Sequence, residues 1–308
     1  GIIMKAEAYM KRGEQALLHT YNRTPVVLER GEGVYLYDVD GKKYLDFAAG
    51  IAVVGLGYGN PEFETALKNQ VEKLTHTSNL YYNVPAIETA EKLQKVSGMD
   101  RVFFTNSGTE AIEGAIKTAR KYAMKKDGTK DHEIIAMDHS FHGRSMGSLS
   151  VTGNPHYQED FKPLLSGVRF AEYNNLESVK SLVDEKTCAI LLEPIQGEGV
   201  IYPADGECLR GLRALCDERD ILLIFDEIQA GYGRSGKMFA GQNFDVTPDI
   251  MNLGKAIAGG LPMSATVSTE KIMSKWLPGM HGGTFGGNPV VCAGALEVLN
   301  RVSDPNFL

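Results

Sequence analysis

Four short groups of polar side chains each follow an apolar run of about strand length, and their residue types suit different parts of one chemistry. The groups are Ser107-Gly108-Thr109 after RVFFT, Phe141-His142-Gly143-Arg144 after EIIAM, Asp226 after ILLIF, and Lys255 after DIMNL. Hydroxyl groups and backbone N–H groups at the start of a helix favour phosphate binding. A lysine among small and apolar neighbours is a nucleophile suited to attack on a carbonyl group.

Each group, taken alone, also has an ordinary structural interpretation. Ser107 and Glu110 have the S-x-x-E spacing of a helix capping box. Arg144 could form a salt bridge in a surface loop, and Asp226 could be a structural carboxylate held by backbone N–H groups or by a lysine. Lys255, like most lysines, could be a solvated cation. Single groups therefore leave these alternatives open.

One ligand accounts for the four groups together, namely pyridoxal phosphate, a planar phosphorylated pyridine aldehyde. It requires a phosphate cup, a stacking aromatic ring, an anion at the ring nitrogen and a lysine for covalent attachment. Phe141 could stack on the ring, and the forked guanidinium of Arg144 could hold a substrate carboxylate. Asp226 follows apolar residues, and a buried carboxylate needs a cationic partner such as a pyridinium nitrogen. The sequence thus predicts this cofactor and, lacking Cys or His at zinc spacing, no metal.

A nucleotide hydrolase is the main competing interpretation, because LLIFDEIQAGYGRSGK (222–237) combines a Walker-B-like strand with G-x-x-x-x-G-K. Met238 follows the lysine where Ser or Thr should hold magnesium. The glycines also lie directly after the acid, whereas a phosphate loop must follow its own strand and open a helix. We therefore reject this interpretation.

The elements that must position these groups alternate along the chain. The expected strands are 101–105, 133–137, 167–171, 188–193, 221–225, 249–253 and 265–268, with helix-like segments between most of them. This alternation predicts an α/β fold with a mostly parallel sheet covered by helices on both faces. In such a fold ligands bind beyond the carboxyl ends of the strands. Residues 26–47 instead have strand and turn patterns that predict a small antiparallel unit.

Composition limits the class of protein. The chain has 308 residues, of which 43% are hydrophobic and 23% charged, with a formal net charge of -7. An acidic chain argues against nucleic acid or an anionic membrane as the main partner. The N-terminal sequence lacks the apolar core of a signal peptide, and the four cysteines form no C-x-x-C pair. We expect a cytoplasmic protein with reduced thiols.

Long motifs resemble the class III (fold type I) aminotransferases, which depend on pyridoxal phosphate. They are FFTNSGTEAIEGAIKTAR, SFHGRS, EPIQGEG, LLIFDEIQAGYGRSG, PDIMNLGKAIAGGLP and HGGTFGGNP. Within that family, HTSNLYYN and SLSVTGNPHYQEDFKPLL resemble acetylornithine aminotransferases most. The resemblance runs from about residue 21 to the end of the chain.

The resemblance implies a role for individual residues. Lys255 would bind the cofactor covalently and later move a proton on the substrate. Asp226 would pair with the ring nitrogen, Phe141 would stack on the ring with His142 beside it, and Gln229 would reach the ring hydroxyl. The remaining implied residues hold phosphate (Ser107, Gly108, Thr109, and Thr284 for the neighbouring subunit) or substrate (Tyr21, Arg144, Glu198, Gly283). A homodimer with its active site at the subunit interface follows.

The same resemblance implies transfer of the amino group of N2-acetylornithine to 2-oxoglutarate, as in arginine biosynthesis. The alternatives are a 4-aminobutyrate or succinylornithine aminotransferase, or a pyridoxal-phosphate-binding protein without full activity. Ile51 occupies a position where ornithine aminotransferases have Tyr, which argues against free ornithine. The family pattern usually continues beyond residue 308, into a part expected to supply a further substrate-binding arginine.

The pattern divides the chain into three parts. Residues 1–59 are expected to form an N-terminal segment with small antiparallel strands, and residues 60–289 a large cofactor-binding domain. Residues 290–308 would begin a truncated C-terminal small domain.

Overall fold

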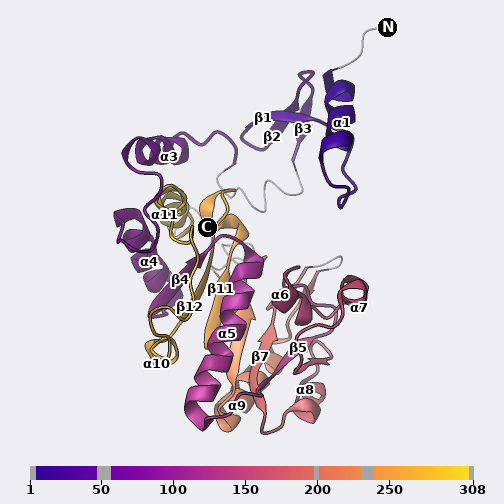
Figure 1. The fold of residues 1–308 in the computed structure, drawn as a ribbon, viewed down its shortest axis with the longest axis vertical. Coiled ribbons are helices and arrows are strands. Elements are labelled where there is room, and N and C mark those ends of the chain that lie inside the picture. Colours follow the sequence, from indigo (N-terminus) through magenta and orange to yellow (C-terminus); the bar gives the residue numbers. More distant parts are fainter. Residues whose placement is uncertain (1–4, 47–56, 198–200, 230–238, 305–308) are drawn as a thin grey trace.

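A seven-stranded sheet forms the centre of the molecule (Figure 1), in a computed structural model that describes residues 5–46, 57–197, 201–229 and 239–304. Its strands lie in the order β4-β12-β11-β10-β7-β5-β6. Their bounds are β4 Arg101–Thr105, β5 Glu133–Met137, β6 Val168–Ala171, β7 Thr187–Leu192, β10 Leu222–Asp226, β11 Ile250–Leu253 and β12 Ser264–Ser268. The predicted strands are confirmed to within about a residue at each end.

The sheet is parallel except at one strand. β12 runs antiparallel to both β11 and β4, whereas β10 is parallel to β11 and β7, and β5 is parallel to β7 and β6. The carboxyl ends of the parallel strands consequently meet along one edge. This edge is where the predicted ligand-binding groups follow their strands.

Helices and short helical turns occur along the described part of the chain, and most of them, though not α1, cover the sheet or connect its strands (Figure 1). They are α1 Lys5–Ala16, α3 Pro61–Lys73, α4 Val84–Ser97, α5 Gly108–Asp127, α6 Met146–Ser150, α7 Pro155–Gln158, α8 Leu176–Leu182, α9 Gly206–Arg219, α10 Glu270–Met273 and α11 Pro289–Val302, with 3₁₀ turns η1 Glu159–Phe161, η2 Ala240–Phe244 and η3 Lys255–Ala258. Side chains cap several helix starts, since Asn83 accepts from the N–H of Ala86 and Ser107 from that of Glu110.

Three buried clusters hold these layers together. One lies between α5 and the sheet and includes Ile112, Ala115 and Ile224. A second, which includes Leu212 and Phe225, lies on the opposite face under α8 and α9. The third joins α3, α4 and α11 to the β11–β12 side of the sheet. The two faces are therefore both covered, as the apolar strands predict.

A separate three-stranded antiparallel sheet precedes α3. It consists of β1 Leu28–Glu32, β2 Tyr35–Asp38 and β3 Lys43–Leu45, in that order. The antiparallel unit predicted over residues 26–47 is thus confirmed. Gly33 pairs with Tyr58 just before α3, and the Tyr58 hydroxyl donates to Asp46 Oδ2 over 2.6 Å. These contacts attach the small sheet to the segment that enters the large one.

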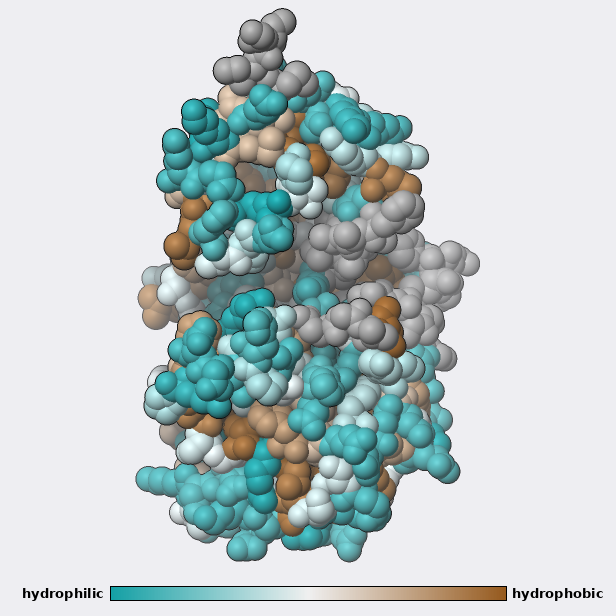
Figure 2. Space-filling view, turned by 90° about the vertical axis from the view of Figure 1, so that its right-hand side faces the viewer, coloured by the Kyte–Doolittle hydropathy of each residue, from teal (hydrophilic) through white to brown (hydrophobic). Residues whose placement is uncertain are grey.

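A short ribbon and the character of the surface complete the description of the fold. A two-stranded ribbon, β8 Ile195–Gln196 with β9 Tyr202–Pro203, follows the central strand β7. Figure 2 shows a mainly hydrophilic face on which hydrophobic residues form separate patches. Among the described residues, no helix combines the length and the apolar character needed to span a membrane.

Candidate active site

The ends of β10 and β11 bring Asp226 and the segment before Lys255 together. These strands are parallel neighbours, with Asp226 opposite Asn252. Ile228 follows Asp226 and packs closely against two glycines, because an added Cβ would lie 3.1 Å from Ile228 at Gly108 and 3.2 Å at Gly254. The starts of α5 and η3 are therefore both held against the end of β10.

A buried pair of side chains, Asp226 and His142, occupies the end of β10. His142 Nδ1 donates to Asp226 Oδ2 over 2.7 Å, and the N–H of Ile228 donates to Asp226 Oδ1 over 2.9 Å. The two side chains are 0% and 4% exposed. Burial alone would lower the pKa of His142, but the hydrogen bond and negative charge of Asp226 outweigh it and raise that pKa above its ordinary value.

This pair fits the ring nitrogen of pyridoxal phosphate. Each carboxylate oxygen has two acceptor positions, and the contacts above use one on each, so Asp226 retains acceptor capacity for a pyridinium N–H. His142 Nε2 is buried and has no hydrogen-bond partner within the described ranges. A polar atom left in this state marks a place where a further group belongs.

The start of α5 is where the sequence predicts a phosphate-binding cup. Its first backbone N–H groups have no acceptor within the helix, and the helix dipole favours an anion there. Thr109 Oγ1 lies 2.6 Å from Ser145 Oγ, and Ser145 Oγ donates to Glu113 Oε1 over 2.7 Å. The Ser107 hydroxyl accepts a hydrogen bond from the Glu110 N–H and donates one to Glu110 Oε1. Ser107 therefore caps α5, and its role in phosphate binding stays a prediction.

Gly143 allows the loop after β5 to approach this cup. Its φ is +138°, and an added Cβ would lie 2.5 Å from Thr109 Oγ1. No other residue type combines that backbone conformation with that contact. The loop that contains Phe141 and His142 is thus fitted directly against the start of α5.

Arg144 lies over an aromatic pair at the mouth of the same loop. The rings of Phe141 and Tyr157 meet edge to face with centroids 5.6 Å apart. The Arg144 guanidinium lies 4.8 Å from the Tyr157 centroid and 5.8 Å from that of Phe141. No carboxylate in the described part of the chain forms an ion pair with Arg144, so its fork remains available for a ligand carboxylate.

Lys255 begins the turn η3 directly after β11. Its φ of +50° is unusual for a residue with a side chain, and such strain is concentrated at functional positions. Its side chain is exposed rather than enclosed by the apolar neighbours that flank it in sequence. The amine is accordingly accessible to a ligand.

Thr284 and Gly283 lie in an exposed loop before α11. Asn79 Nδ2 donates to the carbonyl oxygens of Gly283 and Gly286 over 3.1 and 3.0 Å, and Asn83 Nδ2 donates to that of Gly287 over 3.0 Å. The motifs HTSNLYYN and HGGTFGGNP are thereby fastened to each other. Neither Thr284 nor Gly283 is brought by these contacts to the Asp226–His142 pair.

For three other predicted residues, the structure gives little information about their roles. Tyr21 is 66% exposed, and the contact described for it is with the Arg23 guanidinium, 5.2 Å from its ring centroid. Gln229 is half-buried immediately after Ile228. Glu198 lies outside the described residues, so its predicted role stays a prediction.

Sequence reasoning missed three residues that shape the site. Ser145 and Glu113 orient Thr109, and no spacing signal connects Glu113 on α5 with the SFHGRS motif. Glu227 is 1% exposed and accepts hydrogen bonds from the N–H groups of Ala240 and Gly241 over 2.9 and 3.2 Å. Burial raises the pKa of Glu227 to about 7. Its position after Asp226 is the only signal that pointed to it.

Comparison with known proteins identifies the family. The family model "Aminotransferase class-III" matches residues 17–308. An acetylornithine aminotransferase of Clostridium acetobutylicum is 51% identical over 288 residues, covering 94% of this chain and 74% of that protein. One of Methanocaldococcus jannaschii is 49% identical over 301 residues, covering 98% of this chain and 76% of its own length.

Solved structures agree with this result. An ornithine aminotransferase of Toxoplasma gondii superposes with a TM-score of 0.94 at 33% identity, covering 99% of this chain and 73% of that one. An acetylornithine aminotransferase of Elizabethkingia anophelis superposes with a TM-score of 0.86 at 35% identity, covering 99% of this chain and 74% of that one. Together with the motifs and the geometry at the sheet edge, these matches show that the chain belongs to the class III aminotransferases, which are pyridoxal-phosphate-dependent enzymes.

Proposed function

We propose that the chain transfers the amino group of N2-acetylornithine to 2-oxoglutarate, as in arginine biosynthesis. The observation on which this substrate rests is the 51% identity, over 288 residues, to a protein named acetylornithine aminotransferase. The site supports the reaction class, because its groups match the parts of pyridoxal phosphate one by one.

Pyridoxal phosphate, when bound, supplies an electron sink for the charge left on the substrate carbon after its proton is removed. The chain's own task is to hold and orient the reactants. The start of α5, with Ser107, Gly108 and Thr109, holds the phosphate, and Phe141 packs against the ring. Asp226 keeps the ring nitrogen protonated, with His142 fixing the carboxylate through their buried hydrogen bond.

Lys255 binds the cofactor and then moves the proton. Its amine would hold the cofactor and, when free, would take a proton from the carbon that bears the transferred amino group and return it one atom away. The exposed side chain and the end-of-strand position of Lys255 leave its amine accessible to a ligand. Gln229 reaches the ring hydroxyl.

Arg144 holds the substrate so that its reacting carbon is correctly placed. Its guanidinium, backed by the Phe141–Tyr157 pair, binds the α-carboxylate of the amino donor, with Tyr21 assisting and Gly283 lining the substrate region. Because the transferred amino group of N2-acetylornithine is at the opposite end of the molecule from its α-carboxylate, Arg144 would fix the carboxylate end and so position the amino-bearing carbon for reaction. Glu198 would mask a second substrate-binding arginine until the dicarboxylate 2-oxoglutarate binds.

A homodimer completes the site in this proposal, with Thr284 reaching the cofactor phosphate of the neighbouring subunit. Thr284 is exposed, and large apolar side chains beside the same fastened motifs are exposed as well: Leu80 85%, Tyr81 72%, Tyr82 92% and Phe285 59%. Apolar surface of this kind is typical of an interface between subunits. All four cysteines are free thiols, which supports a cytoplasmic location.

Turnover of purified protein with different donors tests the proposal. Acetylornithine, ornithine, succinylornithine and 4-aminobutyrate are each incubated with 2-oxoglutarate, and glutamate is measured. We expect acetylornithine to give the highest kcat/KM. A higher value for another donor would contradict the substrate, and the absence of glutamate with every donor would contradict the activity of this chain.

A further inference from the structure

A cavity of about 390 Å³ lies beside the C-terminal half of α5, and half of the residues that line it are lysine or arginine. Lys117, Arg120 and Lys121 come from α5, and Lys130 comes from the turn that leads to β5. Positions three and four apart on a helix share one face, so the three α5 cations point to the same side. Trp276, from the segment after α10, closes the cavity.

These four cations have no carboxylate partner in the part of the chain that the structure describes. Within residues 5–46, 57–197, 201–229 and 239–304 none of the four forms an ion pair; the nearby Asp127 is bound to His132 over 2.8 Å instead. Arg120 Nη2 donates to the carbonyl oxygen of Ser166 over 3.3 Å, while Arg120 Nε is buried and unpartnered. Like charges on one helix face repel each other. The chain as a whole is acidic, with a net charge of -7, so its composition does not account for four cations gathered at one place.

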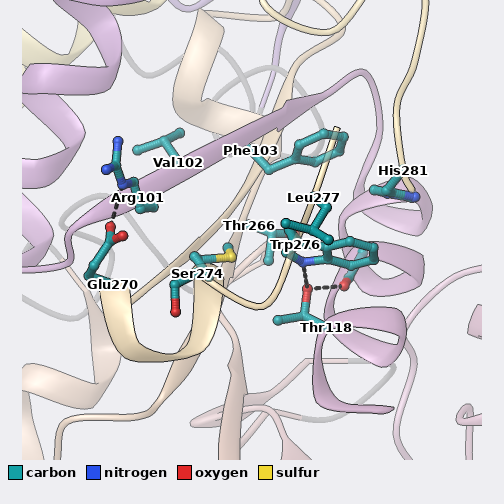
Figure 3. Close-up of a pocket in the computed structure, with 12 residues that line it drawn as sticks. Arg101, Val102, Phe103, Thr118, Thr266, Glu270, Ser274, Trp276, Leu277 and His281 are labelled. Carbon is teal, nitrogen blue, oxygen red and sulfur yellow. Dashed lines mark hydrogen bonds and ion pairs between the residues drawn. The ribbon is translucent and has the colours of Figure 1, made fainter. Parts of the chain in front are cut away.

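The wall of this cavity is built from fixed groups. The Trp276 ring stacks on His281 with centroids 5.4 Å apart at 25°, and its Nε1 donates to Thr118 Oγ1 over 3.0 Å (Figure 3). Lys117 Nζ lies 2.7 Å from His281 Nδ1. Burial and the Lys117 charge lower the pKa of His281, so a neutral imidazole accepts from the ammonium group. Figure 3 shows a second cavity, of about 470 Å³, whose wall also includes Trp276.

We propose that the cavity bounded by Lys117, Arg120, Lys121, Lys130 and Trp276 binds a small oxyanion with at least two negative charges, a phosphate or a polycarboxylate. A guanidinium fork and several ammonium groups match the oxygens of such an anion in geometry and charge. A monovalent anion would leave most of the cations uncompensated. The volume of about 390 Å³ suits a small molecule.

Calorimetry on the pyridoxal-phosphate-loaded protein tests this site. The loaded form is used because its cofactor already fills the phosphate cup at the start of α5. Pyrophosphate and citrate are titrated separately at constant ionic strength, with sodium chloride as the reference. We expect saturable binding of at least one of them, one per chain, and the comparison assigns the anion to the phosphate or the polycarboxylate class. If neither anion binds saturably, the proposal is wrong. This holds also where the reason is that a second copy of the chain covers the cavity.

Charge reversal distinguishes this cavity from general electrostatic attraction. Lys121→Glu combined with Lys130→Glu should raise the dissociation constant at least about tenfold. Lys95→Glu combined with Lys125→Glu is the matched control, because it changes the net charge equally and both lysines are exposed and outside the cavity wall, and it should change the constant less than about twofold. Equal effects in both variants would overturn the proposal. If circular dichroism shows that the variant with Lys121→Glu and Lys130→Glu is misfolded, Lys130→Ala alone gives the same comparison.

Discussion

At the scale of single residues, the Asp226–His142 pair is the feature that most strongly links this chain to its chemistry. The sequence predicted Asp226 at a ligand-binding edge because a charged residue directly follows four apolar ones. It did not predict the hydrogen bond to His142, since the two residues lie 84 positions apart and meet only through the sheet order.

The raised pKa of His142 predicts a pH-dependent contribution to stability. The folded pKa lies above the unfolded value, so the contribution is full below the ordinary histidine pKa of about 6.5 and is lost as pH rises through the folded pKa. His142→Asn should cost about 3 kcal/mol at pH 6, because it breaks a buried pair. Urea unfolding of the cofactor-free proteins from pH 6 to 9 should show this cost shrinking. A cost that grew with pH would contradict the pairing.

Glu227 gives a second prediction, with the same direction of pH dependence. Its pKa of about 7 exceeds the value of 4.5 for a free glutamate, so folding is favoured by protonation and the native state loses stability as pH rises between these values. Glu227→Gln removes this charge. Relative to the unmodified protein, the free energy of unfolding of Glu227→Gln should rise by about 3 kcal/mol between pH 5 and pH 8. An unchanged difference across this range would show that the carboxylate is not held in the buried position described.

At the scale of elements, the strands were predictable and their pairing was not. Apolar runs such as ILLIF and EIIAM specify buried strands locally, and the helices between them specify parallel connections. The insertion of β12 between β4 and β11, and its antiparallel direction, depend on long-range packing that no local pattern encodes. For the same reason the contact of Ser145 and Glu113 with Thr109 was missed: it joins a loop after β5 to the first turns of α5.

The fit between that loop and α5 predicts the effect of Gly143→Ala. The new Cβ would collide with Thr109 Oγ1 and would also require a left-handed backbone conformation, so the loop must move away from the phosphate cup. We expect a loss of about 1–3 kcal/mol of stability and a weaker affinity for pyridoxal phosphate, measured by fluorescence titration. Gly98→Ala is the control, since Gly98 also has a positive φ, +72°, but no atom of the described residues lies within 4 Å of its added Cβ. Equal cofactor affinity in both variants would contradict the role of this contact.

At the scale of the whole molecule, the site is incomplete within one chain under the proposed function. The contacts that fasten residues 79–83 to the loop of Thr284 hold Thr284 exposed beside Tyr82 and Phe285, rather than at the Asp226–His142 pair. The sequence predicted this arrangement only through its family resemblance, because an interface between subunits leaves no periodic signal in a single chain. Its consequence is that Lys255 and Thr284 of one site should come from different subunits.

Subunit complementation tests this consequence. Lys255→Ala removes the amine, and Thr284→Asp places a negative charge where the phosphate of the neighbouring site is expected, so each variant alone should be almost inactive. In a mixed dimer, one site has both substitutions and the other has neither, because each site takes Lys255 from one subunit and Thr284 from the other. Random reassortment makes about half of the dimers mixed, so the mixture should recover about a quarter of the unmodified activity per subunit. If Thr284 instead served its own subunit, every site in the mixed dimer would carry one change. Mixing would then restore nothing, whatever the extent of subunit exchange shown by native mass spectrometry.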